Sequence, residues 1–248
     1  MTGNTISVRP YGNRAILIEF DQRISLELNQ SVQRLCQLLA KLNLSAIQNL
    51  LPAFCSLTVL FDPDAIEVLE LERIIRRIVE VDLQASTANA TVAVCNNETK
   101  DSNAGNKILI PVCYEEPFAL DWKDVEQNTG LSVDEIIERH TGCEYQVFMV
   151  GFLPGFAYLG AVDESIRCPR RDQPRLHVPL GSVGIADGQT GVYPLDAPGG
   201  WQIIGRTPIS MFGTESQPFL LKPGDTVEFE SIDRSAFEEI QQRNRGEG

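Results

Sequence analysis

The stretch over residues 151–212 restricts the fold more strongly than any other part of the 248-residue chain, because most of the glycines and many of the prolines lie there. Both residue types interrupt helices, so a long helix is excluded in this stretch. Short apolar runs lie between them, for example at 183–186 and 201–204. Short strands joined by tight turns are typical of a small β-barrel. We therefore predict that this stretch forms the body of a barrel.

The N-terminal part predicts a small α+β domain over residues 1–83. Alternating apolar residues predict three strands, at 6–11, 15–20 and 56–61, and Pro52 is interpreted as an interruption before the third. Apolar residues at spacings of three and four predict a helix from Ser25 to about Leu42, and the acidic start at 62–64 predicts a second helix. This order suits two helices packed on one face of an antiparallel sheet.

Residues 84–106 are mostly small and polar, and we interpret them as a flexible linker that includes a short strand at 91–94. The barrel domain then occupies residues 107–248. Its predicted strands include 108–114, 145–150 and 226–229. Its predicted helices are 121–128, which ends at a glycine, 132–140, which begins with a capping box, and 233–243. The predicted fold class is α+β, with a small α+β domain followed by a β-barrel.

The net charge of −13 argues against nucleic-acid and membrane partners, since both need a basic surface. The paired helices at 121–140 imitate a helix-turn-helix, but their acidic residues would face phosphate groups. No apolar run approaches the length that spans a bilayer, and the first residues lack the pattern of a signal peptide. We therefore expect a cytoplasmic protein.

The cysteines argue against a metal site and against a disulfide framework. All six are widely scattered without a Cys-x-x-Cys pair, and the chain has only two histidines. We expect no bound metal and mostly buried thiols. Cys168 stands among arginines, which would favour a reactive thiolate. We favour the other interpretation, a strand-end residue beside a basic turn.

Neither histidine has a single role that its position dictates. His140 ends an amphipathic helix, where it can act as an acid or base or stabilise the helix end. His177 alternates into a strand, which is typical of a surface or interface residue. The chain has neither common phosphate-binding loop. The glycines at 181 and 184 either present backbone N–H groups to an anion or form barrel corners.

Arginines at the glycine- and proline-rich turns form the sharpest signal, and they are Arg170, Arg171, Arg175 and Arg206. Guanidinium groups bind carboxylates and phosphates through paired hydrogen bonds, which indicates an anionic ligand. Ion pairs to a partner protein, or to acids of the same chain, explain the same residues equally well. For Arg206, Asp196 is the candidate internal acid.

The motifs of the central stretch together resemble those of one family. They are Gly-Phe-Leu-Pro-Gly-Phe from Gly151, Gly-Ser-Val-Gly-Ile-Ala from Gly181, Gln-Thr-Gly-Val-Tyr-Pro from Gln189 and Pro-Gly-Gly-Trp-Gln-Ile-Ile-Gly-Arg-Thr-Pro from Pro198. With Arg-Pro-Tyr-Gly-Asn from Arg9, the similarity extends over nearly the whole chain. The chain resembles the family of 5-oxoprolinase B subunits, also called the allophanate hydrolase subunit 1 or KipI family. The resemblance implies that the C-terminal barrel is cyclophilin-like.

The resemblance also implies a part of an ATP-dependent 5-oxoprolinase, which hydrolyses 5-oxo-L-proline to L-glutamate. In such an enzyme the B subunit acts with a homologous C subunit and a hydrolytic A subunit. ATP is then the cofactor, bound by this chain or by one of its partners. Other members of the family imply two alternatives. One is an inhibitor of sensor histidine kinase autophosphorylation. The other is the carboxyltransferase half of a urea carboxylase-like enzyme, with biotin supplied by a partner.

The chemistry of this substrate predicts where the chain acts. The carboxylate of 5-oxoproline and a phosphorylated intermediate are both anionic, so we predict a site on the barrel, at the surface shared with the C subunit. The predicted catalytic residues are His140, Arg170 and Arg206. The predicted substrate-binding residues are Arg171, Arg175, Ser182, Gln189, Thr190 and Tyr193. Among these, Gln189 and Tyr193 can hydrogen-bond a lactam oxygen or N–H group.

Overall fold

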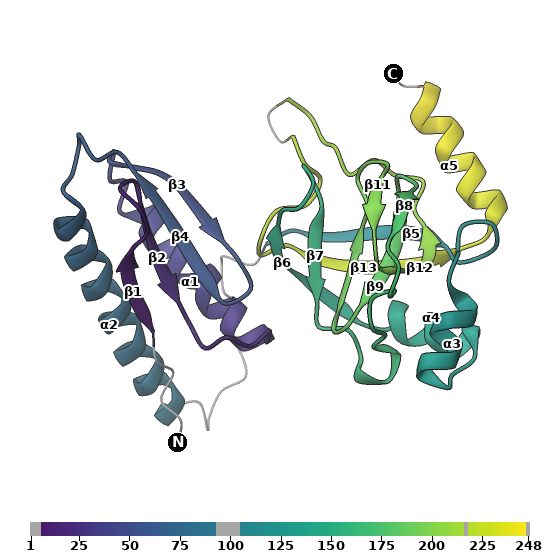
Figure 1. Cartoon of the computed structure of the whole chain (residues 1–248), viewed down its shortest axis with the longest axis horizontal. Coiled ribbons are helices and arrows are strands. Elements are labelled where there is room, and N and C mark those ends of the chain that lie inside the picture. The colour runs from purple at the N-terminus through teal and green to yellow at the C-terminus, as the bar shows by residue number, and fades with distance from the viewer. Residues whose placement is uncertain (1–5, 93–104, 216–217, 247–248) are drawn as a thin grey trace. The chain divides into compact units, whose positions relative to one another are not determined.

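The computed structural model describes residues 6–92, 105–215 and 218–246, and the chain divides into two compact units, 1–104 and 105–248 (Figure 1). The division falls inside the predicted linker. Each unit has its own apolar core, so we describe each by itself. Within the described residues, no helix combines the length and the hydropathy that crossing a membrane requires.

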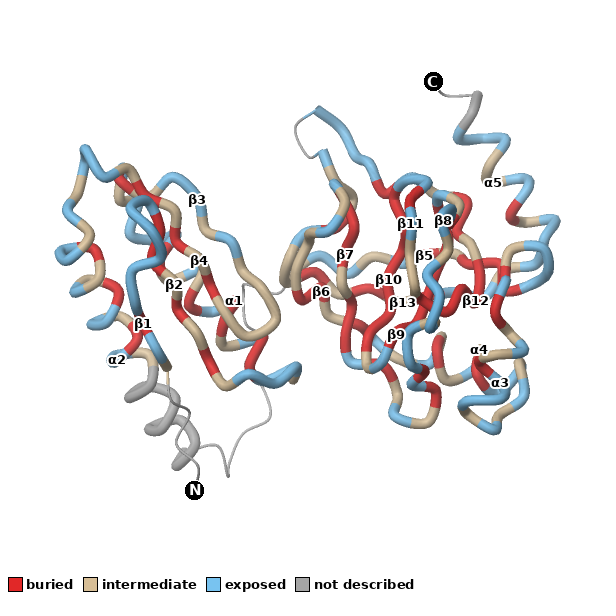
Figure 2. Tube along the Cα trace, viewed as in Figure 1, coloured by how far each residue is buried: buried red, intermediate tan, exposed pale blue. Residues whose placement is uncertain are grey.

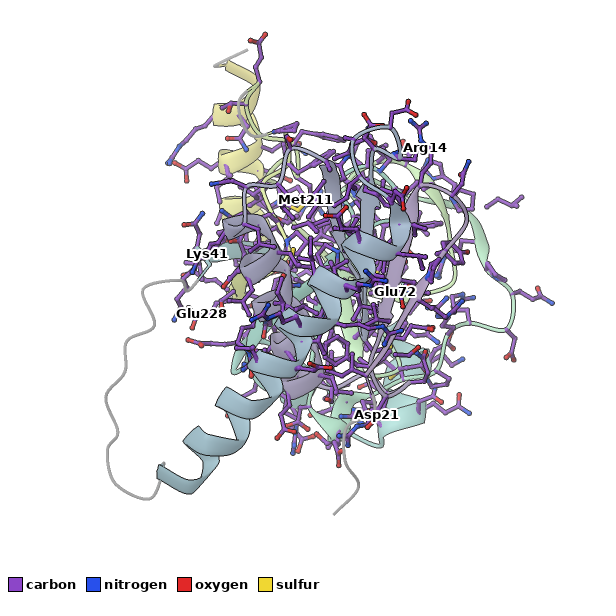
Figure 3. All side chains as sticks on the ribbon, turned by 90° about the vertical axis from the view of Figure 1, so that its left-hand side faces the viewer. Arg14, Asp21, Lys41, Glu72, Met211 and Glu228 are labelled. Carbon is purple, nitrogen blue, oxygen red and sulfur yellow. The ribbon has the colours of Figure 1, made fainter. Side chains whose placement is uncertain are left out.

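The first unit is a four-stranded antiparallel sheet with two helices on one face. Its strands are β1 (Ser7–Pro10), β2 (Ala15–Glu19), β3 (Ile47–Pro52) and β4 (Ser56–Phe61), in the order β1-β2-β4-β3. The helices are α1 (Leu26–Lys41) and α2 (Val68–Val92), which pack on each other and on the sheet. Alternation sends Ile16, Ile18 and Val59 into the core. Charged side chains such as Arg14 and Lys41 remain exposed (Figure 3). The predicted arrangement is confirmed.

Strand β3 was not predicted, because Pro52 was interpreted as an interruption. The structure places Pro52 within β3, paired with Leu57 of β4. Proline lacks an N–H donor, and it is therefore tolerated on an edge strand such as β3.

Helix α2 differs from the prediction at both ends. The predicted start at 62–64 is wrong: Asp62 forms a turn there, with its side chain accepting from the N–H of Asp64 at 3.0 Å, and the helix begins at Val68. The helix also continues to Val92, through residues predicted as linker and into the predicted strand at 91–94. Residues 84–92 contain no glycine or proline, so none of them strongly opposes continuation of a helix that has already begun. The rest of the predicted linker, 93–104, lies outside the described residues.

The second unit is a closed barrel, as predicted. Its strands are β5 (Lys107–Cys113), β6 (Glu144–Val150), β7 (Ala157–Gly160), β9 (Ser182–Ala186), β10 (Gln189–Val192), β12 (Gln202–Arg206) and β13 (Thr226–Ile232). They close in the order β10-β7-β6-β13-β5-β12-β9, with β9 paired to β10. Only the β13–β5 pair is parallel among the pairings of these strands. A separate two-stranded sheet joins β8 (Arg175–Val178) to β11 (Ala197–Gly199).

Helices α3 (Trp122–Thr129) and α4 (Val133–Thr141) follow β5, with the ends that the sequence predicts. Gly130 ends α3 in the left-handed conformation, at φ 71°. Ser132 and Glu135 form the capping box that begins α4. The 3-10 helix η1 (Glu164–Ile166) and the terminal helix α5 (Arg234–Gly246) complete the unit. The backbone N–H groups of Leu120 and Asp121 both donate to the Ile203 carbonyl at 3.0 Å, so the start of α3 is tied to β12.

Strands β9 and β10 are buried along their whole length (Figure 2). Val183 and Ile185 belong to the barrel core, whereas Ala186 belongs to a second apolar cluster with Tyr193 and Trp201. Two apolar layers therefore cover the two faces of β9, which explains why its side chains do not alternate between core and solvent. Any polar side chain on these strands is buried.

Candidate functional site

The structure does not bring the predicted site residues into one place. Arg170, Arg171 and Arg175 lie near the start of α3, Tyr193 and Arg206 line a cavity beside α5, and Ser182, Gln189, Thr190 and His140 are buried. The three locations differ in charge, exposure and hydrogen bonding.

The carboxylate of Asp121 binds two of the predicted arginines. Its two oxygens accept from Arg175 at 2.6 and 2.8 Å, and Oδ1 also accepts from Arg171 at 2.5 Å. Oδ2 also accepts a hydrogen bond from the backbone N–H of Ile203, at 2.6 Å. The Asp121 side chain is 1% exposed, while those of Arg171 and Arg175 are about a quarter exposed. We call Asp121, Arg171 and Arg175 the Asp121 cluster.

Arg171 and Arg175 form the ion pairs to acids of the same chain that were one of the interpretations of the sequence, and their assignment to substrate binding stays a prediction. Arg175 uses both terminal nitrogens on Asp121, and Arg171 divides one nitrogen between Asp121 and Asp124, the latter at 2.9 Å. Internal carboxylates thus accept the charged hydrogen bonds of both arginines. The cluster joins the start of α3 to β8 and β12, which is a structural role.

A polar cavity of about 570 Å³ lies beside this cluster and contains the third arginine. Arg170 is exposed and makes no ion pair with any described residue. The neighbouring groups of the cavity wall are polar, and they include Asp124, Gln127, Asn128, Asp172 and Gln202. Two carboxylates in the wall offset the cations, so this cavity has no strong preference for an anion.

A second cavity, of about 620 Å³, contains Arg206 and is here called the Arg206 pocket. Its wall combines Tyr193 and Asp196 with apolar side chains from the segment 208–212. The Arg206 guanidinium lies over the ring of Phe118, 5.2 Å from its centroid. Its Nε is buried without a hydrogen-bond partner, and burial lowers the pKa of this guanidinium.

Asp196, the predicted internal partner of Arg206, is engaged elsewhere. Its Oδ1 accepts from the backbone N–H of Leu180 at 2.6 Å, and its Oδ2 lies 3.4 Å from Nε2 of His177. The pKa of Asp196 is lowered, chiefly by the hydrogen bond from the Leu180 N–H and to a smaller extent by His177 and the charge of Arg206. No ion pair joins Asp196 to Arg206 in the described structure. Arg206 therefore differs from the two arginines of the Asp121 cluster, because the Asp196 charge acts on it without a direct ion pair.

His140 lies in the barrel core with no exposed surface. The Thr190 hydroxyl donates to the Gly184 carbonyl at 3.0 Å, so it accepts from Nε2 of His140 at 2.9 Å. The Nδ1 atom then accepts from the Tyr114 hydroxyl at 2.8 Å. Burial lowers the pKa of His140 to about 3. Both ring nitrogens of His140 have partners within the chain, and solvent does not reach His140 or Thr190. Neither residue is therefore part of the proposed site.

Ser182 and Gln189 are buried on the barrel strands. The Ser182 hydroxyl and the Gln189 amide nitrogen have no hydrogen-bond partner in the described part of the chain. Neither residue lines the Arg206 pocket or the polar cavity. Their assignment to substrate binding remains a prediction.

Cys168 is buried, and burial raises the pKa of its thiol to about 11. The interpretation as a strand-end residue fits the structure, since Cys168 forms an isolated bridge with Asp187. Among the described residues, no group of histidines, cysteines or carboxylates is arranged to hold a metal ion.

The sequence did not identify Asp121 and Phe118 as site residues. In the structure Asp121 pairs with Arg171 and Arg175, and Phe118 packs against Arg206. Both stand in an unremarkable segment before α3, far from the glycine-rich motifs. Asp121 stands at the N-cap of α3, a position that by itself suggests a local capping role. Its side chain makes no capping hydrogen bond and instead contacts arginines more than 40 positions away in the chain. Only the fold brings these residues together.

Comparison with known proteins identifies the family. Residues 6–221 match the carboxyltransferase domain, subdomains C and D. The chain is 36% identical to the 5-oxoprolinase B subunit of Bacillus subtilis, over 93% of this chain and 94% of that protein. The chain belongs to the family of 5-oxoprolinase B subunits.

Two solved structures resemble this chain in fold. A conserved uncharacterized protein from Pyrococcus horikoshii is 40% identical, with 93% of this chain and all of that chain covered and a TM-score of 0.52. The urea carboxylase of Kluyveromyces lactis shares the fold, at 19% identity and a TM-score of 0.73. This chain spans only 23% of that longer protein. The family resemblance drawn from the sequence motifs is confirmed.

Proposed function

We propose that this chain is the B subunit of an ATP-dependent 5-oxoprolinase, and that it hydrolyses 5-oxo-L-proline to L-glutamate only together with the A and C subunits. The observation that carries the proposal is the similarity to the 5-oxoprolinase B subunit of Bacillus subtilis over almost the full length of both chains. We place the complex in the cytoplasm, where ATP is available.

The side chains support a role that depends on partners. The histidine of the predicted catalytic set is buried, and the thiol beside the arginines is buried and protonated at neutral pH. What the barrel offers in the Arg206 pocket is an arginine that forms no direct ion pair with a described residue and whose Nε has no hydrogen-bond partner. Such a group binds and orients a carboxylate, while the activating chemistry comes from elsewhere in the complex.

The chemistry explains why ATP and several subunits are needed. A lactam is a poor electrophile, and transfer of the terminal phosphoryl group of ATP to its oxygen, with release of ADP, activates the carbonyl carbon toward water. Water adds to that carbon, the ring C–N bond breaks as the nitrogen takes up a proton, and a second water hydrolyses the resulting acyl phosphate to glutamate and phosphate. In the proposal, Arg206 holds the carboxylate of 5-oxoproline at the surface shared with the C subunit, and Tyr193 forms part of the same pocket wall. The assignment of Arg170 to catalysis remains a prediction, because Arg170 lines the polar cavity and not the Arg206 pocket.

Reconstitution tests the function. The purified A and C subunits combined with this chain should release glutamate and ADP from 5-oxoproline and ATP, whereas this chain alone should release neither. Hydrolysis by this chain alone, or a complex that works equally well without it, would contradict the proposal. A chain that is inert in the complex but blocks autophosphorylation of a sensor histidine kinase would support the alternative function.

Substitution of Arg206 tests the site. Arg206→Lys keeps the charge but loses the paired hydrogen bonds, which are worth on the order of 2–4 kcal/mol, or roughly 30- to 1000-fold in rate. Arg234→Lys is the matched control, because within the described part of the chain Arg234 forms an ion pair only with Glu238, and both side chains are exposed on α5. Specific activity and thermal unfolding are measured on the same preparations. An Arg206→Lys complex with wild-type specific activity would remove Arg206 from the site.

A further inference from the structure

Phe118 lies against the arginine to which the proposed function assigns the substrate carboxylate. The Arg206 Cζ stands over the Phe118 ring, 5.2 Å from the ring centroid. An aromatic face attracts a cation through its quadrupole, and the attraction increases where water is partly excluded. Phe118 and Arg206 are both intermediate in exposure, and the Arg206 Nε is buried. The ring is therefore a direct electrostatic contact of the guanidinium.

This contact differs in kind from the one that holds Arg175. Asp121 accepts hydrogen bonds from both terminal nitrogens of Arg175, at 2.6 and 2.8 Å. A ring face cannot accept such a pair of hydrogen bonds from a guanidinium, and the charge of Asp196 acts on Arg206 without a direct ion pair. Phe118 therefore orients the cation without competing with a ligand for its paired donors.

The Phe118 ring is itself held from two sides. It packs on the ring of Phe237 in α5, with the centroids 4.3 Å apart, and Phe237 is buried. The backbone N–H of Phe118 donates to the Glu115 carbonyl at 2.9 Å, and the N–H of Leu120 donates to the Ile203 carbonyl of β12 at 3.0 Å. The position of the ring is thus set by α5 and by the segment before α3, independently of Arg206.

The stem of Arg206 is also held in place. This residue pairs with Cys113 of β5 and with Ser182 of β9, so strands flank it on both sides. A Cβ at Gly181 would lie 3.3 Å from the Arg206 Cγ and 2.6 Å from the Thr207 carbonyl oxygen, so only glycine permits this close approach. The freedom that remains to the side chain lies mainly in its guanidinium, which is the part that contacts the ring.

We propose that Phe118, supported by Phe237, is a positioning residue whose ring fixes the orientation of the Arg206 guanidinium for its ligand. A cation that is already oriented loses less freedom when a carboxylate binds, so the ring acts on the reaction through Arg206. That Arg206 binds the substrate rests on the proposed function, whereas the contact that orients it does not. The ring should therefore act through its electrostatics as well as its size.

Stepwise fluorination of the Phe118 ring separates these two contributions. Each added fluorine weakens the attraction of the ring face for a cation but changes the ring size little. With mono-, di- and trifluorinated phenylalanine incorporated at position 118, kcat/KM of the reconstituted complex for 5-oxoproline should fall stepwise, by about 3- to 30-fold in total. The same series at Phe229, whose ring stacks on His140 in the barrel core, should leave kcat/KM unchanged. An active complex with a flat series at Phe118, or with equal losses at both positions, would overturn the positioning role.

Nuclear magnetic resonance of the full chain alone tests the orientation without the reaction. Ring currents displace the resonances of protons near an aromatic face, and the Arg206 Nε–H signal is identified by its loss in Arg206→Lys. Phe118→Leu should displace this signal, whereas Phe118→Tyr, which keeps the aromatic face, should restore the wild-type position. An unmoved signal in folded Phe118→Leu would refute the proposal. A complex without activity, combined with the expected displacement of the signal, would refute the proposed function and leave the orienting contact established.

Discussion

Replacement of Asp121 by asparagine should destabilise the barrel unit strongly, because this one buried carboxylate forms ion pairs with two arginines. An asparagine would keep the size of the side chain but lose the charge and half of the acceptor capacity for Arg171, Arg175 and the Ile203 N–H. Removal of one partner from a buried ion pair costs about 3–5 kcal/mol. Arg171 keeps Asp124, and both arginines are about a quarter exposed, so we expect about 2–4 kcal/mol.

The two tryptophans make this change measurable in the barrel unit alone. Trp122 and Trp201 both belong to the unit 105–248, so their fluorescence follows its unfolding in urea. A loss of about 2–4 kcal/mol corresponds to a decrease of roughly 4–16 °C in Tm for a domain of this size. The slope of the urea transition should stay constant, because the fold is the same.

Asp124→Asn is the matched control for this experiment. Asp124 contacts only Arg171 in the cluster, and its side chain is 48% exposed, so its loss should cost less than about 1 kcal/mol. Equal destabilisation by the two variants, or a change below about 0.5 kcal/mol for Asp121→Asn, would refute the reasoning. A stable Asp121→Asn protein whose complex loses activity would instead return Arg171 and Arg175 to the substrate site.

Two further predictions concern buried titratable groups. The pKa of His140 is lowered to about 3 in the folded chain, so the unfolded chain binds the extra proton and stability falls as the pH decreases below about 6.5. Between pH 7.5 and pH 5.5, the free energy of unfolding of the wild type, measured in urea, should fall by about 1.4 kcal/mol more than that of a His140→Gln variant. The same pH dependence in both proteins would contradict this. Cys168, whose thiol pKa is raised to about 11, should resist iodoacetamide at pH 7.5 in the folded chain and react in urea, as measured by peptide mass spectrometry. Rapid labelling of folded Cys168 would show that the thiol is exposed and activated.

Local patterns in the sequence were sufficient for most of the secondary structure. Ser25 caps α1, Ser132 and Glu135 cap α4, and Gly130 ends α3, because capping depends on residues that are adjacent in the chain. The density of glycine and proline in 151–212 was sufficient for the barrel. The errors arose where context outweighs local preference, as at Pro52, which is acceptable only because β3 lies at a sheet edge.

The use of each arginine was decided by tertiary structure alone. Arg171, Arg175 and Arg206 stand at similar turns with similar neighbours, and nothing in the sequence separates them. The fold brings Asp121 to Arg171 and Arg175 from 50 and 54 residues away, whereas it sets Asp196 against Leu180 and His177 and leaves Arg206 over Phe118. His140 likewise became a core residue when the barrel closed around it. Ion pairing depends on distances of a few ångströms between segments far apart in the chain, and only the packed structure determines those distances.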